Sequence, residues 1–61
     1  MKPKKVSRKA IRKIIETRQP IGSFYAKDHW FFVGVDNRTG DAWTRDFRRK
    51  KECLKWLKGD G

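Results

Sequence analysis

The sequence predicts an α+β domain with a three-stranded antiparallel sheet, flanked along the chain by an N-terminal and a C-terminal helix in the order α-β-β-β-α. Apolar residues recur at helical spacing near both ends of the chain, and between them the period changes to two. The 61 residues include 3 Trp, 1 Tyr and 4 Phe, enough aromatic surface for a core. A chain this short has room for one core, so we expect a basic lead-in over residues 1–6 and a single domain over residues 7–59.

The first helix is expected to begin after Ser7, whose hydroxyl can accept a hydrogen bond from a free backbone N–H of the first turn. Pro20 disfavours helical geometry at Gln19, so the helix should end near Arg18. Met1 to Lys5, before this helix, is expected to be frayed. The apolar stripe comprises Val6, Ala10, Ile11, Ile14 and Ile15, and the basic residues opposite it are Arg8, Lys9, Arg12 and Lys13.

Three short strands are expected in the middle of the chain. Alternation and β-branched or aromatic residues predict strands over Ser23 to Ala26, Trp30 to Val35 and Ala42 to Phe47. Lys27-Asp28 is expected to form the first turn. Asp36 to Gly40 is typical of a hairpin connection, in which Gly40 adopts the left-handed conformation.

The second helix is predicted over Glu52 to Leu57, with Gly59 as its stop. Its apolar side is formed by Cys53, Leu54, Trp56 and Leu57. Because Cys53 lies on this side, we expect a buried and unreactive thiol. A single cysteine also favours a reducing compartment, and we expect a cytoplasmic protein.

The positive charge is concentrated in the helical segments. The whole chain has a net charge of +10, of which residues 1–20 contribute +7, residues 21–47 contribute −1 and residues 48–61 contribute +4. Such an excess raises encounter rates with polyanions. The expected partner is therefore anionic, and the expected contacts lie on the helices rather than on the nearly neutral sheet.

The run Arg48-Arg49-Lys50-Lys51 leads into a helix, where it is unfavourable for stability. The macrodipole favours acidic residues at a helix start, so each cation there costs about 0.3–1 kcal/mol. Ser, Thr, Asp and Asn, the preferred N-cap residues, are absent as well. A solvated basic surface is the simpler interpretation, but the unfavourable sign indicates a phosphate-binding site at this helix start.

Exposed aromatic residues would distinguish between two kinds of partner. Trp30 and Trp43 are candidates for stacking on bases or for contact with a protein. They would be exposed if both helices packed on one face of the sheet. Aromatics interleaved with Arg and Lys would favour nucleic acid, whereas a separate aromatic patch would favour a protein partner.

Two families are similar to parts of this chain. The order α-β-β-β-α and Lys50-Lys51-Glu52-Cys53 resemble the double-stranded RNA-binding domain, whose second helix begins with a Lys-Lys-x-Ala stretch that grips phosphates. Asp28-His29 lies roughly where that family carries a histidine that contacts the minor groove. The run from Phe47 to Cys53, followed by Trp56-Leu57, resembles the strand-to-helix junction of arm-type DNA-binding domains of phage integrases. Both resemblances imply nucleic-acid binding.

Catalytic, metal-binding and membrane functions are not expected. His29 and Cys53 are the only residues of their types, and no metal-ligand spacing or Gly-rich phosphate loop is present. No apolar run approaches the ~18 residues of a membrane span. We therefore expect no enzyme, no cofactor, no metal and no membrane partner.

The predicted function is binding of duplex nucleic acid, DNA or RNA, through its phosphates and with low sequence specificity. Phosphate contacts position a protein on nucleic acid but do not read bases. The alternative is an interaction protein, for example a phage-type inhibitor or adaptor that binds an acidic surface of a host protein, because aromatics and Arg dominate binding hot spots. A small subunit of a ribonucleoprotein assembly is a third possibility. The predicted clamp is Arg48, Arg49, Lys50 and Lys51, and the second basic surface is Arg8, Lys9, Arg12 and Lys13.

Overall fold

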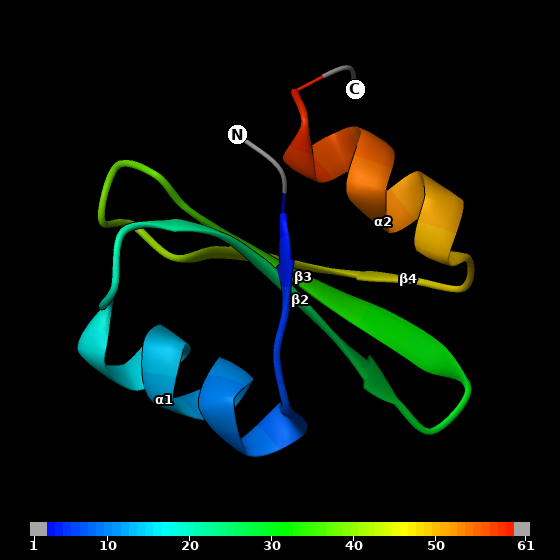
Figure 1. Ribbon diagram of the computed structural model, residues 1–61, viewed down its shortest axis with the longest axis horizontal. Coiled ribbons are helices and arrows are strands. Elements are labelled where there is room, and N and C mark those ends of the chain that lie inside the picture. Colours follow the sequence, from blue (N-terminus) through cyan, green and yellow to red (C-terminus); the bar gives the residue numbers. More distant parts are fainter. Residues whose placement is uncertain (1–2, 60–61) are drawn as a thin grey trace.

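The protein is a four-stranded mixed sheet with one helix on each face, as seen in a computed structural model that describes residues 3–59 (Figure 1). Strand β1 pairs in parallel with β2, and the other neighbours are antiparallel, in the spatial order β1-β2-β3-β4. The α+β class is confirmed, whereas the three-stranded antiparallel sheet and the order α-β-β-β-α are wrong. The elements are β1 (Lys4–Lys5), α1 (Arg8–Thr17), β2 (Gly22–Asp28), β3 (Phe31–Asn37), β4 (Trp43–Phe47) and α2 (Lys50–Leu57).

The additional strand, β1, lies within the predicted frayed lead-in. Lys4 and Lys5 pair with Phe24 and Tyr25, and the Val6 N–H donates to the Tyr25 carbonyl at 2.8 Å. Two exposed lysines carry no apolar alternation, so periodicity could not predict this strand. Short, lysine-rich edge strands are one way in which proteins protect a sheet edge. The first two residues of the lead-in lie outside the described part of the chain.

Helix α1 has the predicted bounds because both of its ends are encoded locally. The Ala10 N–H donates to the Ser7 hydroxyl at 3.1 Å, which confirms Ser7 as the N-cap. At the other end, Arg18 adopts a left-handed conformation with φ 56°, and its N–H donates to the Ile14 carbonyl at 2.7 Å. Pro20 follows two residues later, so the helix cannot continue.

The first hairpin turns two residues later than predicted. Lys27 and Asp28 are the last residues of β2, and Asp28 pairs with Phe31. The turn is His29-Trp30, where His29 has φ 56°. In the second hairpin, Gly40 has the predicted left-handed conformation, with φ 84°.

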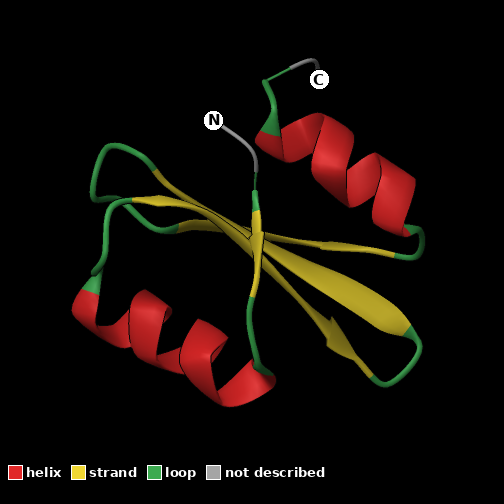
Figure 2. Ribbon diagram, viewed as in Figure 1, coloured by secondary structure: helices red, strands yellow, loops and turns green. Residues whose placement is uncertain are grey.

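The two helices cover opposite faces of the sheet, so neither face is left open (Figure 2). On the α1 face, Ile11 and Ile14 pack with strand residues Phe24, Ala26 and Val35. On the α2 face, the core consists of Tyr25, Cys53 and Leu57, with Phe32, Phe47, Leu54 and Trp56 packed against it.

Gly34 permits the close approach of α2 to the sheet. A Cβ atom at this position would lie 3.0 Å from the Cys53 Sγ and 3.4 Å from two ring atoms of Trp56. The absence of a side chain at the centre of β3 therefore sets the distance between α2 and the sheet. α2 begins at Lys50, two residues before its predicted start, so the basic run forms part of its first turn.

Candidate nucleic-acid interface

The run Arg48–Lys51 forms the junction between β4 and α2. Arg49 is the N-cap of α2 and makes no side-chain capping hydrogen bond, as its residue type predicts. All four side chains are exposed, and within residues 3–59 none of them forms an ion pair with a carboxylate. Their charged groups are therefore not paired directly with a carboxylate of the described chain.

This junction lies at the same end of the sheet as the β2–β3 turn (Figure 1). The pairing of β3 with both neighbours produces this proximity, because Phe32 lies opposite Lys27 on one side and opposite Phe47 on the other. The Arg48 guanidinium lies 5.7 Å from the centre of the Trp30 ring, which is within the range of a cation–π interaction. Trp30 is 69% exposed, so this pair is open to a partner. We call this region the basic–aromatic end and define it as Trp30, Phe47 and Arg48–Lys51.

Two further cations lie over aromatic rings on the α2 side. The Lys50 Nζ is 5.7 Å from the centre of the Tyr25 ring, and the Arg45 guanidinium is 5.5 Å from that of Phe47. Basic and aromatic side chains are thus interleaved at this end of the molecule. A cleft of about 280 Å³ opens beside the Arg48–Trp30 pair and is lined by Trp30, Phe31, Asp46, Phe47 and Arg48.

The second predicted basic surface faces the other way. Its four side chains are exposed on α1, the helix that covers the opposite face of the sheet (Figure 1). Arg8 already forms an ion pair with Asp28, because its Nη1 lies 3.1 Å from the Asp28 Oδ1. The structure therefore attaches the two basic clusters to helices on opposite faces of the sheet, with Arg8 beside the β2–β3 turn through its pair with Asp28. The residues of this α1 surface are Arg8, Lys9, Arg12 and Lys13.

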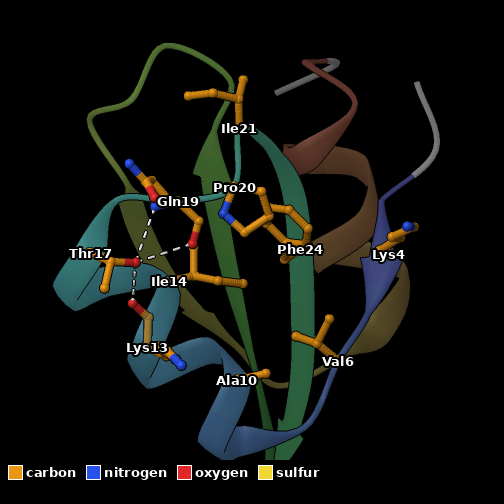
Figure 3. A pocket seen from close by; sticks show the side chains of 10 residues that line it. All are labelled: Lys4, Val6, Ala10, Lys13, Ile14, Thr17, Gln19, Pro20, Ile21 and Phe24. Atoms are coloured by element: carbon orange, nitrogen blue, oxygen red, sulfur yellow. Dashed lines mark hydrogen bonds between the residues drawn. The ribbon is translucent and has the colours of Figure 1, made fainter.

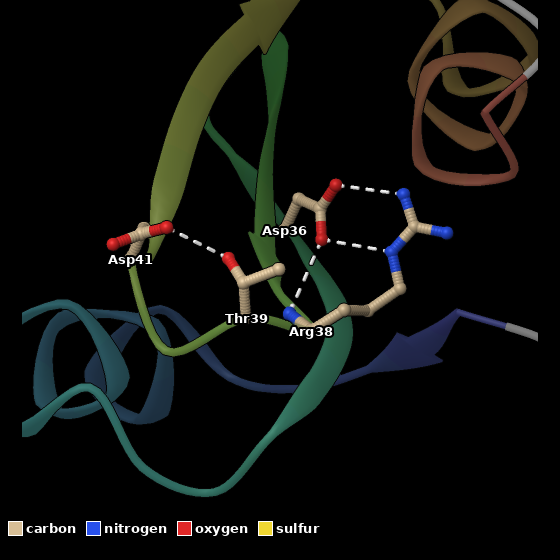
Figure 4. A network of polar contacts seen from close by, with 4 residues as sticks. All are labelled: Asp36, Arg38, Thr39 and Asp41. Carbon is tan, nitrogen blue, oxygen red and sulfur yellow. Dashed lines mark hydrogen bonds and ion pairs between the residues drawn. The ribbon is translucent and has the colours of Figure 1, made fainter.

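Trp43 is exposed but lies at the opposite end of the sheet from Trp30. It begins β4 opposite Asp36 and is 65% exposed. Beside it, Asp36 accepts hydrogen bonds from the Arg38 Nε at 2.9 Å and from its Nη2 at 2.8 Å (Figure 4). The hydrogen bonds from Arg38 hold the pKa of Asp36 below its usual range, against the opposing effect of burial, and Asp36 raises the pKa of Arg38. This pair orders the β3–β4 loop and takes no part in the basic–aromatic end.

His29 and Cys53, the single residues of their types, lie in different elements of the fold. His29 is exposed in the first turn, with its Nε2 3.6 Å from the Asp28 Oδ1. Cys53 is fully buried on the side of α2 that faces the sheet, as predicted, and burial raises the pKa of its thiol to about 11. The thiol is therefore protonated at neutral pH. Among residues 3–59, no three His, Cys, Asp or Glu side chains are grouped so that they could hold a metal ion.

An apolar groove of about 830 Å³ runs between α1, β1 and β2 (Figure 3). Val6, Ile14 and Phe24 line it, with Lys4 and Lys13 among the other lining residues. Near its end, the Thr17 hydroxyl donates to the Lys13 carbonyl at 2.8 Å and accepts from the Gln19 N–H at 3.3 Å. Sequence reasoning missed this groove because one of its walls is the unpredicted strand β1. None of the described helices is long and apolar enough to cross a membrane.

The chain matches no protein-family model, no curated protein and no solved structure. The resemblances to the double-stranded RNA-binding domain and to integrase arm-type domains therefore depend on the residues quoted for them alone.

Proposed function

We propose that this protein binds nucleic acid, gripping duplex phosphates at its basic–aromatic end with low sequence specificity. The observation that carries the proposal is the position of Arg48 over the exposed ring of Trp30, directly beside three further cations. Aromatic rings interleaved with Arg and Lys suit a polymer that presents both phosphates and bases. The single cysteine supports a cytoplasmic setting for this activity.

The chemistry of the four cations fits this role. Arg offers a planar fork that can bind two phosphate oxygens, whereas Lys contributes a compact point charge. Binding would release counterions from the nucleic acid, which makes affinity strongly dependent on salt. Phosphate contacts of this kind carry no sequence information, so low specificity is expected.

The alternative is an inhibitor or adaptor that binds an acidic surface of another protein. The exposed side chains of Trp43 and Ile21 favour it, because they lie away from the Arg48–Lys51 run. The apolar groove beside α1 adds a surface of the same kind. In this case apolar contacts would add to the attraction between the basic chain and the acidic surface, and nucleic acid would bind weakly at physiological salt.

Fluorescence anisotropy with labelled duplex DNA, duplex RNA and single strands tests the proposal. If the protein makes four phosphate contacts, duplex affinity should fall about a hundredfold between about 50 and 200 mM salt. Replacing Arg48, Arg49, Lys50 and Lys51 together with Ala should remove most of this salt dependence. The matched control replaces Arg8, Lys9, Arg12 and Lys13 with Ala, which changes the net charge equally and should cost less affinity.

Weak binding of every nucleic acid at physiological salt would contradict the proposal. An equal loss of affinity in the two quadruple variants would also contradict it, since net charge rather than the basic–aromatic end would then control binding.

A further inference from the structure

The cleft at the basic–aromatic end has a volume of about 280 Å³, and Trp30, Phe31 and Phe47 are the aromatic residues among those that line it. Trp30 and Phe31 meet edge to face, with ring centres 5.3 Å apart and an angle of 64° between their planes. Phe47 packs against Trp56 on the α2 face of the sheet, at 5.6 Å between ring centres. The cleft therefore has an apolar wall of partly fixed rings that opens to solvent.

Two charged groups complete the lining and differ in sign. Arg48 comes from the junction before α2. Asp46 lies two positions earlier in the chain, near the end of β4. Within residues 3–59 the Asp46 carboxylate has no ion-pair partner. A carboxylate in the cleft repels phosphate, so the cleft itself is unsuited to the phosphate backbone.

We propose that this cleft takes one unpaired nucleobase that carries an exocyclic amino group, while Arg48 and its neighbours hold the adjacent phosphates. This inference rests on the proposed function and names the part of the ligand that the aromatic residues contact. Every base has a π face that can stack on an aromatic ring, and such stacking is worth about 1–3 kcal/mol per base. The cleft is far too small for a base pair, so the base must come from a strand end or a single-stranded segment.

The carboxylate accounts for the selectivity. Ionised Asp accepts hydrogen bonds and donates none, and the cytosine amino group is the donor with which Asp and Glu pair in base recognition. Thymine and uracil offer a single N–H between two carbonyl oxygens, which a carboxylate repels. We therefore expect cytosine to be preferred over thymine at the bound position.

A cationic side chain of a protein would also suit aromatic rings beside a carboxylate. Arg48 already places a guanidinium over Trp30, however, and the chain has a net charge of +10. Both features disfavour a second cation in the cleft and favour a neutral base attached to an anionic backbone.

The test compares three duplexes of one sequence: a blunt duplex, one with a single overhanging dC and one with a single overhanging dT. The dC overhang should raise affinity at least about fivefold over the blunt duplex, the lower end of the stacking range, and should exceed the dT overhang. Trp30→Ala should abolish the gain, so that in this variant the dC-overhang duplex binds no more tightly than the blunt duplex. Asp46→Asn should remove the preference for dC, because an amide can both donate and accept, whereas Asp41→Asn at the far end of the sheet should keep it.

The outcomes separate this inference from the proposed function. Tight binding of the blunt duplex with no effect of either overhang would overturn the base site and leave phosphate binding intact. An equal gain from dC and dT that Asp46→Asn does not alter would overturn the assigned selectivity. Absence of binding to all three duplexes would overturn both, and displacement of the overhang by a trimethyl-lysine peptide would assign the cleft to a cation instead.

Discussion

Asn37, at the end of β3, joins two loops through its side chain. It is fully buried, its Nδ2 donates to the Pro20 carbonyl at 2.8 Å, and its Oδ1 accepts from the Ala42 N–H at 3.0 Å. The segment after α1 and the β3–β4 loop are therefore held by one amide. The sequence indicated only a turn residue here, since a hydrogen bond to Pro20 depends on the folded arrangement.

Asn37→Ala should destabilise the protein by about 2 kcal/mol, because it leaves a carbonyl and an N–H without their partner. Chemical denaturation measures this loss as a lower midpoint with an unchanged slope. The control is Thr39→Ala in the same loop, whose hydroxyl donates to the exposed Asp41 carboxylate at 2.8 Å. Similar losses in the two variants would show that Asn37 does not join the loops in the manner described.

The Asp36–Arg38 pair predicts a dependence of stability on pH. Because Arg38 lowers the pKa of Asp36 in the folded state, the pair stabilises the fold above about pH 4, the ordinary range of the carboxyl group. This contribution is lost as the pH falls through the lowered pKa. Because solvent screens the exposed Arg38, this contribution is expected to be small.

The measurement is the free energy of unfolding of the wild type and of Asp36→Asn across the acid range. The wild type should be the more stable of the two at neutral pH, and the difference should shrink below about pH 4. A difference that stayed constant with pH would mean that the pair does not contribute through its charge.

At the scale of single elements, the start of α2 combines a poor cap with a basic run. Arg49→Ser supplies a hydroxyl at the N-cap and should stabilise the free protein by about 0.5–1 kcal/mol. The same change removes one cation from the basic–aromatic end, so it should weaken duplex binding and lower the salt slope by about one. The two effects have opposite signs and are measured by thermal unfolding and by anisotropy.

Lys55→Ser is the matched control for Arg49→Ser. It removes one positive charge from the same helix but lies in its last turn, away from the N-cap. We expect slightly lower stability and a smaller change in affinity. Unchanged binding in Arg49→Ser would exclude Arg49 from the interface.

The elements that the sequence predicted well are those whose ends are encoded locally. Ser7 and Pro20 delimit α1, and Gly40 marks the second hairpin. Strand β1 could not be predicted, because its lysines are placed by backbone pairing with β2 and not by an apolar pattern. The first turn was misplaced because Lys27-Asp28 has turn-like polarity, whereas the pairing of β2 with β3 moves the turn to the bulkier His29-Trp30.

The candidate site was predicted in its charge but not in its geometry. The unfavourable sign of Arg48–Lys51 at a helix start singled out these residues in the sequence. The contact between Arg48 and Trp30 depends on β3 lying between β2 and β4, which no local pattern encodes. Whether Trp30 is core or exposed is likewise decided by the register Asp28–Phe31.

At the scale of the whole molecule, the sheet separates α1 from α2, and each of these helices carries one of the two basic clusters or adjoins it (Figure 1). The Cα positions span 26 × 25 × 15 Å, so the molecule is thin across its shortest axis. Because α1 and α2 cover opposite faces of the sheet, we expect that one straight duplex gripped at the basic–aromatic end does not also lie along the outer side of α1. The α1 surface therefore remains available to a second nucleic-acid molecule.

We expect the protein to bridge duplexes at low salt, and light scattering from long duplex DNA titrated with protein at about 50 mM salt measures this. Replacing Lys9, Arg12 and Lys13 with Ala leaves the Arg8–Asp28 pair intact, and it should abolish the scattering while one-to-one binding to a short duplex persists. The quadruple Ala variant of Arg48–Lys51 should lose both, because it removes the primary grip. If the α1 variant still bridged duplexes as the wild type does, bridging would have to come from self-association through the basic–aromatic end or the sheet edge. The opposite placement of the two charge clusters would then have no role in binding.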